Sequence, residues 1–318
     1  MTITPTRLSI DGGQSGTRLR LSAGGQVLSE TAGSGVLTDR PVVEQIADLT
    51  VALATSTGRR IDELAVGTSG LTPAAANPQG LLAATERVGV GRVALAHDSI
   101  TGYLAANGTE PGVMLAVGTG VVVLALSATT VAKVDGWGYL LGDAGSGYWV
   151  GRAGLDAALR AFDGRAPHTT LESTAIDLFG PLDEVYMAVQ ADPHRVSRIA
   201  SFCRPVVDAA TAGDEVARAI VAAAAAELAH SAASALTRVG WQPGEYARVG
   251  AVGALATRSA TMRDALSTAM AERAPGATLE APIGLPLDGV QSLLDVSDGH
   301  PLRAFIHTAQ VPATPRQH

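Results

Sequence analysis

The chain contains one short pattern twice: an apolar strand, a turn of glycine and hydroxyl residues, and a second apolar strand. The first copy reads "SIDGGQSGTRLRL" (9–21) and the second reads "MLAVGTGVVVLAL" (114–126). Apolar residues on both sides of a tight glycine turn predict a β-hairpin. The two copies share few letters, so we interpret them as a duplication of architecture. Each half of the chain is therefore expected to open with a hairpin.

Strand-like and helical segments alternate after each hairpin. Residues 40–57 have helical spacing and stop at Gly58, whereas "LAVGTSGL" (64–71) and "VALAHDS" (93–99) predict strands. Asp214 precedes a long predicted helix that ends at Gly240, and "ARVGAVGAL" (247–255) predicts a late strand. This alternation predicts an α/β fold with helices packed on sheets. Ligands are expected at the strand ends, where the glycine turns lie.

Composition and charge exclude several classes of function. The 318 residues suffice for two domains, and the net charge of -7, with no basic run, argues against nucleic acid as a partner. Cys203 is the single cysteine, so we expect no disulfide, no zinc knuckle and a reducing, cytoplasmic location. The uncharged stretch 113–132 is long enough to span a bilayer, but Gly118-Thr119-Gly120 divides it. We expect a buried hairpin there and neither a signal peptide nor membrane association.

The two glycine turns carry the groups that bind phosphates. Backbone N–H groups and hydroxyls in such turns can hold phosphate oxygens, and Asp11 can hold the waters of a Mg²⁺ ion. Either turn alone is equally explained as an ordinary tight hairpin. Together they favour a nucleotide site. Its expected residues are Gly13, Gln14, Ser15, Thr17, Thr119 and Gly120, with Asp11 at the metal.

Asp98 stands at the tip of a predicted strand. A carboxylate there can accept the proton of an alcohol during phosphoryl transfer, and it can also cap the following helix; the two roles are compatible. His97 precedes it. Since successive strand residues point to opposite faces, we expect His97 to be structural and not to meet Asp98.

Five segments occur in the order found in one known family: "DGGQSGT", "HDSITGYLAA", "AVGTG", "GWGYLLGDAGSGYWVGR" and "VGAVGAL". Over nearly its whole length the chain resembles the N-acetylglucosamine kinase-like sugar kinases of the BadF/BadG/BcrA/BcrD ATPase family, within the acetate/sugar kinase, Hsp70 and actin superfamily. The resemblance implies two ribonuclease H-like domains with ATP and an amino sugar in the cleft between them, and a homodimer. We expect the domains to be 1–111 plus 299–318, and 112–298.

The resemblance also implies roles for single residues. Asp98 would take the proton from the sugar 6-hydroxyl, and Ser15 and Thr119 would contact the phosphates of ATP, which is used with Mg²⁺. The nucleotide would also be approached by Gly250, Ala251 and Gly253. The sugar would be bound by Ser69, Asp98, Gly136, Trp137, Gly138 and Asp143, with Asp143 accepting hydrogen bonds from the ring hydroxyls.

The chain departs from the family pattern at several positions. Ala144 replaces a glutamate, Ala251 a glycine, and Val121 and Val122 a serine–asparagine pair, while "TAGSGVLTD" (31–39) lacks an asparagine. We therefore expect a kinase whose sugar can be glucosamine, N-acetylglucosamine, N-acetylmuramic acid or a related alcohol. A sugar- or nucleotide-sensing protein without catalysis is the alternative. A reductase activase is disfavoured, because its iron–sulfur cluster needs more than one cysteine per subunit.

Overall fold

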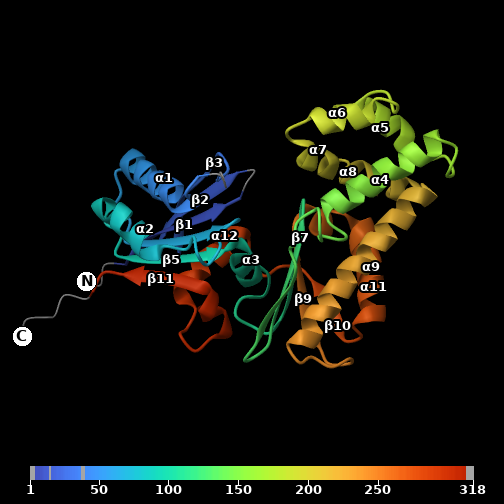
Figure 1. Cartoon of the computed structure of the whole chain (residues 1–318). Coiled ribbons are helices and arrows are strands. Elements are labelled where there is room, and N and C mark those ends of the chain that lie inside the picture. Colours follow the sequence, from blue (N-terminus) through green and yellow to red (C-terminus); the bar gives the residue numbers. More distant parts are fainter. Residues whose placement is uncertain (1–3, 14–15, 37–39, 313–318) are drawn as a thin grey trace, which may run out of the picture. The chain divides into compact units, whose positions relative to one another are not determined.

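A computed structural model describes residues 4–13, 16–36 and 40–312. The chain divides into two compact units, Met1–Glu110 with Pro282–His318, and Pro111–Ala281 (Figure 1). The first division lies one residue from the expected boundary. The chain returns to the first unit at Pro282 and not at residue 299, because helix α12 (Pro286–Ser292) packs on helix α3 (Asp98–Asn107) and strand β1 (Thr6–Gly12).

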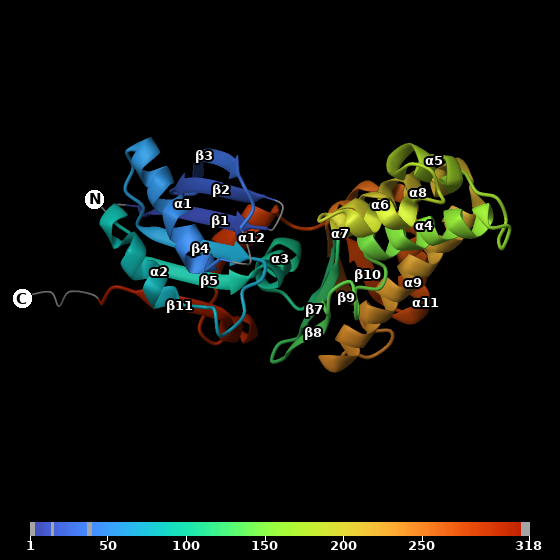
Figure 2. The ribbon, with the colours of Figure 1, turned by 45° about the horizontal axis from the view of Figure 1, so that its top comes forward.

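The first unit contains a six-stranded sheet in the order β11-β5-β4-β1-β2-β3 (Figure 2). Strands β1, β2 and β3 are antiparallel neighbours, β4 and β5 continue the sheet parallel to β1, and β11 closes it antiparallel to β5. The remaining strands of this sheet are β2 (Thr17–Ala23), β3 (Gln26–Gly33), β4 (Glu63–Thr68), β5 (Arg92–His97) and β11 (Ile306–Gln310).

The second unit repeats this arrangement with five strands, in the order β10-β9-β6-β7-β8. Strands β6, β7 and β8 are antiparallel, and β9 and β10 run parallel to β6. Both predicted hairpins and the duplication are thus confirmed, and residues 113–132 form strands. The bounds are β6 (Gly112–Val117), β7 (Val121–Leu126), β8 (Val131–Asp135), β9 (Ala247–Val252) and β10 (Ala277–Glu280).

Successive residues of each strand point to opposite faces of the first sheet, and each face packs against different helices. Leu8, Ile10, Leu64 and Val66 are buried with Ile46 of α1 (Val42–Thr57) in one apolar cluster, to which α2 (Pro78–Thr85) also contributes. The intervening positions are small, and α3 and α12 pack against that side. The predicted helix 40–57 is confirmed as α1, which ends at the left-handed Gly58.

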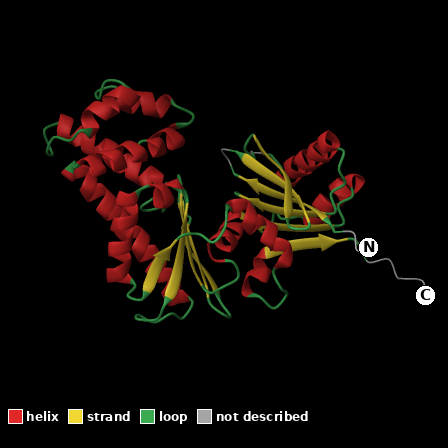
Figure 3. Ribbon diagram, turned by 180° about the vertical axis from the view of Figure 1, so that it is seen from behind, coloured by secondary structure: helices red, strands yellow, loops and turns green. Residues whose placement is uncertain are grey.

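Helices form most of the second unit outside its sheet (Figure 3). Asp214 caps α9 (Glu215–Arg238), as predicted, by accepting the N–H of Ala217 at 3.0 Å. By length and composition α9 could cross a membrane, but half of its most apolar window is buried, and it packs on β6, β7 and β8. The other helices are α4 (Gly147–Phe162), α5 (Leu171–Phe179), α6 (Val185–Ala191), α7 (Arg195–Ser201), α8 (Cys203–Ala212), α10 (Ala254–Arg258) and α11 (Ala260–Arg273).

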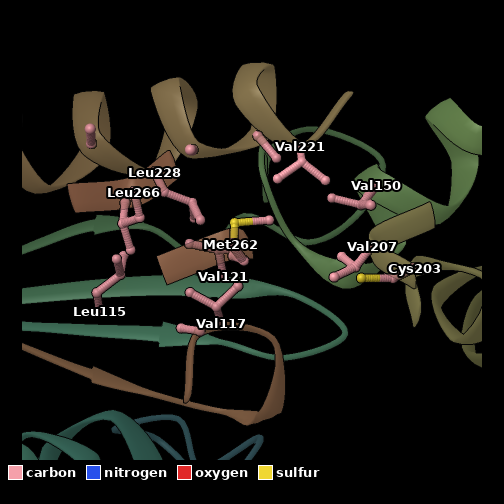
Figure 4. Close-up of a cluster of buried hydrophobic side chains, with 14 of the residues drawn as sticks. Leu115, Val117, Val121, Val150, Cys203, Val207, Val221, Leu228, Met262 and Leu266 are labelled. Carbon is pink, nitrogen blue, oxygen red and sulfur yellow. The ribbon is translucent and has the colours of Figure 1, made fainter. Parts of the chain in front are cut away.

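One apolar core fills the second unit. Side chains of β6 and β7, such as Leu115 and Val121, meet those of α9 and α11 (Figure 4). Cys203 lies in the same core, near Val207, and burial raises the pKa of its thiol to about 12. The thiol is therefore a packing group. The expected α/β class with two related sheets is confirmed.

Candidate functional site

Three parallel strands of the first unit end side by side. Gly12 of β1 is aligned with Thr68 of β4, and Thr68 with His97 of β5. The N–H of Ser69 donates to the carbonyl of Gly12 at 2.9 Å, which ties the first two ends together. We call this border the first edge. It carries Asp11, Ser69 and Asp98, all singled out from the sequence.

Asp98 is the first residue of α3, and 42% of its side chain is exposed. The helix N-terminus carries partial positive charge and stabilises a carboxylate at that position. Helix α3 can lie so close to the sheet because β4 has a glycine beneath it: a Cβ on Gly67 would come within 2.6 Å of the Thr101 side chain. Packing thus fixes the Asp98 backbone while the carboxylate stays accessible.

His97 does meet Asp98, so the prediction that the two side chains stay apart is wrong. Its Nδ1 lies 2.8 Å from Asp98 Oδ1. The rule of opposite faces holds only within a strand, and here the strand ends at His97, which is the N-cap of α3. The change from strand to helix brings the two side chains to one side. The signal in the sequence was the start of the helix at Asp98.

Asp11 lies near Asp98. Burial raises the pKa of the Asp11 carboxyl, the charge of Arg18 lowers it, and the charge of Asp98 raises it further. The Thr17 side chain is buried, and its hydroxyl has no hydrogen-bond partner in the described part of the chain. Between them, Gly13 N–H donates to Gly16 carbonyl oxygen at 2.9 Å. The predicted residues Gln14 and Ser15 lie outside the described residues.

The carboxylate and hydroxyl of the first edge fit a Mg²⁺ ion that shares its ligands with water and phosphate better than a metal ion whose ligands are all protein side chains. Within residues 4–13, 16–36 and 40–312, no three His, Cys, Asp or Glu side chains gather as a metal cage. Mg²⁺ typically keeps several waters and binds one or two carboxylates together with substrate phosphates. Asp11 offers such a carboxylate, and the Thr17 hydroxyl is a buried polar group without a hydrogen-bond partner in the described part of the chain.

The second unit has a corresponding border, which we call the second edge. It is formed by the turn Gly118–Thr119–Gly120 and by Gly253 at the end of β9. The carbonyls of Gly118 and Thr119 accept the N–H groups of Gly147 (2.8 Å) and Tyr148 (3.1 Å) in the first turn of α4. Gly253 has a φ of 97°, and a Cβ on it would collide with the carbonyl of Val117. Glycine is therefore required there.

Gly250 and Ala251 lie differently from Gly253. Both are buried within β9, aligned with Met114 and Leu115 of β6, and Ala251 belongs to the apolar core. A buried residue in the middle of a strand has no surface to offer a nucleotide. Of the three residues expected at the nucleotide, the structure leaves Gly253 exposed, together with Thr119 on the neighbouring turn.

The glycine-rich loop 136–142 follows β8. Gly136 and Gly138 have φ values of 74° and 81°, and the Trp137 side chain is 74% exposed. Asp135 and Asp143, on either side, also have positive φ (60° each). A left-handed non-glycine residue costs free energy and persists where surrounding contacts hold it. Here Asp143 N–H donates to Asp135 Oδ1 at 2.8 Å.

The Asp143 carboxylate is 6% exposed and already has backbone partners. It accepts the N–H of Gly138 at 3.2 Å and lies directly against Gly120. Burial raises the pKa of this carboxyl, and the hydrogen bond from Gly138 opposes the rise. Asp143 thus joins the loop to the turn, a positioning role that the sequence did not reveal. Val122 packs beneath Gly136, whereas Val121 is in the core.

Most of the chain is similar to one known protein family. Residues 8–290 match the model of the BadF/BadG/BcrA/BcrD ATPase family. The N-acetylmuramic acid/N-acetylglucosamine kinase of Clostridium acetobutylicum is 29% identical over 142 residues, which is 44% of this chain and 46% of that protein. The N-acetyl-D-glucosamine kinase of Dictyostelium discoideum is 30% identical over 172 residues, 53% of this chain and 54% of that protein. The chain thus matches about half the length of each curated relative.

A solved structure extends the likeness to the whole fold. The crystal structure of a Chromobacterium violaceum protein, provisionally assigned as an N-acetylglucosamine kinase, is 25% identical with a TM-score of 0.69. The likeness covers 91% of this chain and 99% of that one. With the family model spanning both units and the solved structure sharing their fold, the chain belongs to the BadF/BadG/BcrA/BcrD ATPase family.

Proposed function

We propose that this protein is an ATP-dependent kinase that phosphorylates an amino sugar of the glucosamine or N-acetylglucosamine type at its 6-hydroxyl. One observation carries the proposal: a half-exposed carboxylate, Asp98, begins a helix at an edge where a second carboxylate, Asp11, is near. The likeness to two named amino-sugar kinases supports the substrate class.

Asp98 acts as the general base in this proposal. It orients the sugar hydroxyl and accepts its proton as the oxygen bonds to the γ-phosphorus of ATP and ADP leaves. Phosphoryl transfer demands mainly positioning and charge stabilisation, so one carboxylate with an open oxygen suffices. General-base assistance of this kind contributes about 10²- to 10⁴-fold to a rate.

Each unit offers groups that can bind phosphate oxygens of the nucleotide. The first edge offers Asp11, Gly13 and Thr17, with Ser15 beside them in the sequence, and the second edge offers Thr119, Gly120 and Gly253. Bound Mg²⁺ would neutralise phosphate charge, with Asp11 holding its waters. Since Asp11 is partly buried, its charge is screened less than that of a surface carboxylate.

The residues proposed for the sugar are Ser69 in the first unit and, in the second unit, the loop 136–142, which Asp143 joins to the turn 118–120. Val122 and Ala144 place apolar groups where the family carries polar ones, so a changed preference among amino sugars is expected. The name of the Clostridium relative includes N-acetylmuramic acid, which belongs among the candidates. A homodimer and the cytoplasmic location stay predictions.

The experiment is ADP release with ATP and Mg²⁺ against glucosamine, N-acetylglucosamine, N-acetylmuramic acid, N-acetylmannosamine and glucose. Turnover on one sugar that collapses in Asp98→Asn supports the proposal and identifies the substrate. Turnover that survives this substitution would remove Asp98 as the base. Silence with every sugar, while the sugars or ATP still bind in calorimetry, favours the sensing alternative.

A further inference from the structure

We propose that His97 is a positioning residue for Asp98: its Nδ1–H donates to Asp98 Oδ1 and leaves Oδ2 free for the substrate hydroxyl. This inference rests on the proposed function, because it assigns His97 a part in holding the base of that reaction. The inference thereby adds to the proposed site a residue, His97, that the sequence had led us to interpret as structural.

The short distance between His97 Nδ1 and Asp98 Oδ1 requires a proton on Nδ1. Nδ1 and Oδ1 are 2.8 Å apart. A neutral ring nitrogen without hydrogen would face the carboxylate with its lone pair, whereas an N–H donor makes a charge-assisted hydrogen bond of normal length. Since 37% of the His97 side chain is exposed, solvent can exchange that proton freely.

A capping role competes for the same nitrogen. Nδ1 is also 3.2 Å from the backbone N–H of Ser99 and 2.9 Å from Ser99 Oγ. One nitrogen cannot accept from the amide and donate to the carboxylate at the same time. The bond to Asp98 is the shorter and involves an ion, so we assign the donor form, with the Ser99 hydroxyl turned to offer its oxygen.

His300 provides a contrast within the first unit. Its Nδ1 also lies 3.2 Å from an amide, that of Leu302, at the start of the 3-10 helix Pro301–Phe305. Its Nε2, however, is 3.0 Å from the carbonyl of Thr109, which can only accept. His300 therefore carries its proton on Nε2 and serves as a true cap acceptor, whereas His97 carries its proton on Nδ1.

The surroundings explain why Asp98 benefits from a fixed donor. The charges of Asp98 and Arg18 both act on the buried carboxyl of Asp11, so the two carboxylates lie near each other. Two carboxylates at one edge repel each other, and a half-exposed carboxylate can rotate. A hydrogen bond from the neighbouring ring fixes one oxygen and thereby the direction of the other.

Two substitutions that are isosteric with each other separate the two roles of His97, as a hydrogen-bond donor to Asp98 and as a cap of α3. His97→Asn and His97→Asp both keep an oxygen that can cap α3, but only asparagine can donate an N–H to Asp98. We expect His97→Asn to stay within about 5-fold of the wild-type kcat, and His97→Asp to lose about 10- to 100-fold, because it removes one charge-assisted hydrogen bond and adds a carboxylate that repels Asp98. KM for the sugar and the thermal midpoint should change little in both. His300→Asp is the matched control and should leave kcat unchanged.

Equal kcat in His97→Asn, His97→Asp and wild type would overturn the proposal. So would a loss in His97→Asp that follows its thermal midpoint, since a capping defect alone would explain it.

A spectroscopic test does not depend on activity. Nitrogen-15 NMR of the imidazole rings, assigned with His97→Gln and His300→Gln, should show His97 protonated at Nδ1 and His300 at Nε2. Asp98→Ala should move the His97 proton to Nε2. An Nε2–H form of His97 in the wild type overturns the positioning role even if the kinase is active. An Nδ1–H form in a protein that phosphorylates none of the sugars supports the contact and overturns the proposed function instead.

Discussion

The two units share one strand order but use corresponding positions differently. In the first unit β5 ends at His97, and the next residue is the half-exposed carboxylate Asp98. In the second unit β10 occupies the same place in the sheet and ends at Glu280. That carboxylate forms an ion pair with Arg248 and accepts a hydrogen bond from the Tyr246 hydroxyl.

This difference shows that architecture can be duplicated without its chemistry. At the first edge the Asp98 carboxylate is half-exposed, whereas Asp143 at the second edge is buried and bonded to backbone. We infer that the first unit supplies the reacting carboxylates. Under the proposed function, the glycine turn 118–120 and the loop 136–142 are the ligand-contacting segments of the second unit.

The largest effect on catalysis is expected when Asp98 is substituted, and Glu280 at the equivalent strand end of the second unit is its control. Asp98→Asn should lower kcat about 10²- to 10⁴-fold, because the general base is lost, with little change in the free energy of unfolding. Glu280→Gln, at the equivalent strand end, should leave kcat unchanged and cost about 1 kcal/mol, since its ion pair with Arg248 is partly exposed. Steady-state kinetics and urea unfolding of both variants test this. A catalytic defect in Glu280→Gln would contradict the division of roles between the units.

The hairpins and the long α9 could be predicted because each depends on local signals. Alternation and glycine turns mark the hairpins, and Asp214 with Gly240 marks α9. The contact between His97 and Asp98 could not, since it depends on where the strand stops. The burial of Asp143 against Gly120 and of Ala251 in the core depends on contacts across the sheet, which neighbouring letters do not encode.

Helices α4–α8 were also outside what the sequence pattern revealed. The segments of α5–α8 are short, and in the longer α4 the glycines Gly151 and Gly154 interrupt the helical spacing. The structure gives the reason: a Cβ on Gly151 would collide with the backbone of Ile199, and one on Gly154 with Val206. Close packing between helices, rather than local propensity, selects these glycines.

Glycine substitutions test whether the second edge depends on close backbone contact. Gly253 and Gly244 have φ values of 97° and 94°, but only at Gly253 would a Cβ meet backbone, the carbonyl of Val117. Gly244→Ala should cost about 1–2 kcal/mol for its left-handed backbone alone. Gly253→Ala should cost about 2–4 kcal/mol and raise KM for ATP, because the strand end must move. Equal costs would mean that the Val117 contact is unimportant.

Unfolding at low pH should report on the Asp214 carboxylate, which caps α9 in the second unit. Burial alone would raise the pKa of Asp214, but hydrogen bonds from Ala217, Thr170 and Thr169 outweigh it and lower the pKa to about 2. A carboxyl with a lowered folded-state pKa stabilises the fold above its ordinary pKa, and this stability is lost as pH falls toward 2. Solvent screening reduces the contribution of this partly exposed carboxyl, so we expect about 1–2 kcal/mol to be lost over that range, and Asp214→Asn to reduce the slope. An unchanged slope in urea unfolding at several pH values would contradict this.

The smallest effect concerns two buried hydroxyls of the first sheet, those of Thr17 and Ser9. Neither has a hydrogen-bond partner among the residues that the structure describes. Removing an unpaired buried hydroxyl should leave stability unchanged or raise it by about 0.5–1 kcal/mol, so Thr17→Val and Ser9→Ala should unfold at similar or higher urea concentrations than wild type. They should differ in catalysis. Thr17 follows the turn at the first edge, whereas Ser9 lies within β1, so only Thr17→Val should raise KM for ATP, by about 3- to 10-fold, the equivalent of one lost hydrogen bond. If both variants keep the wild-type KM, the Thr17 hydroxyl is a packing group, and the first edge binds the nucleotide through its backbone and Asp11.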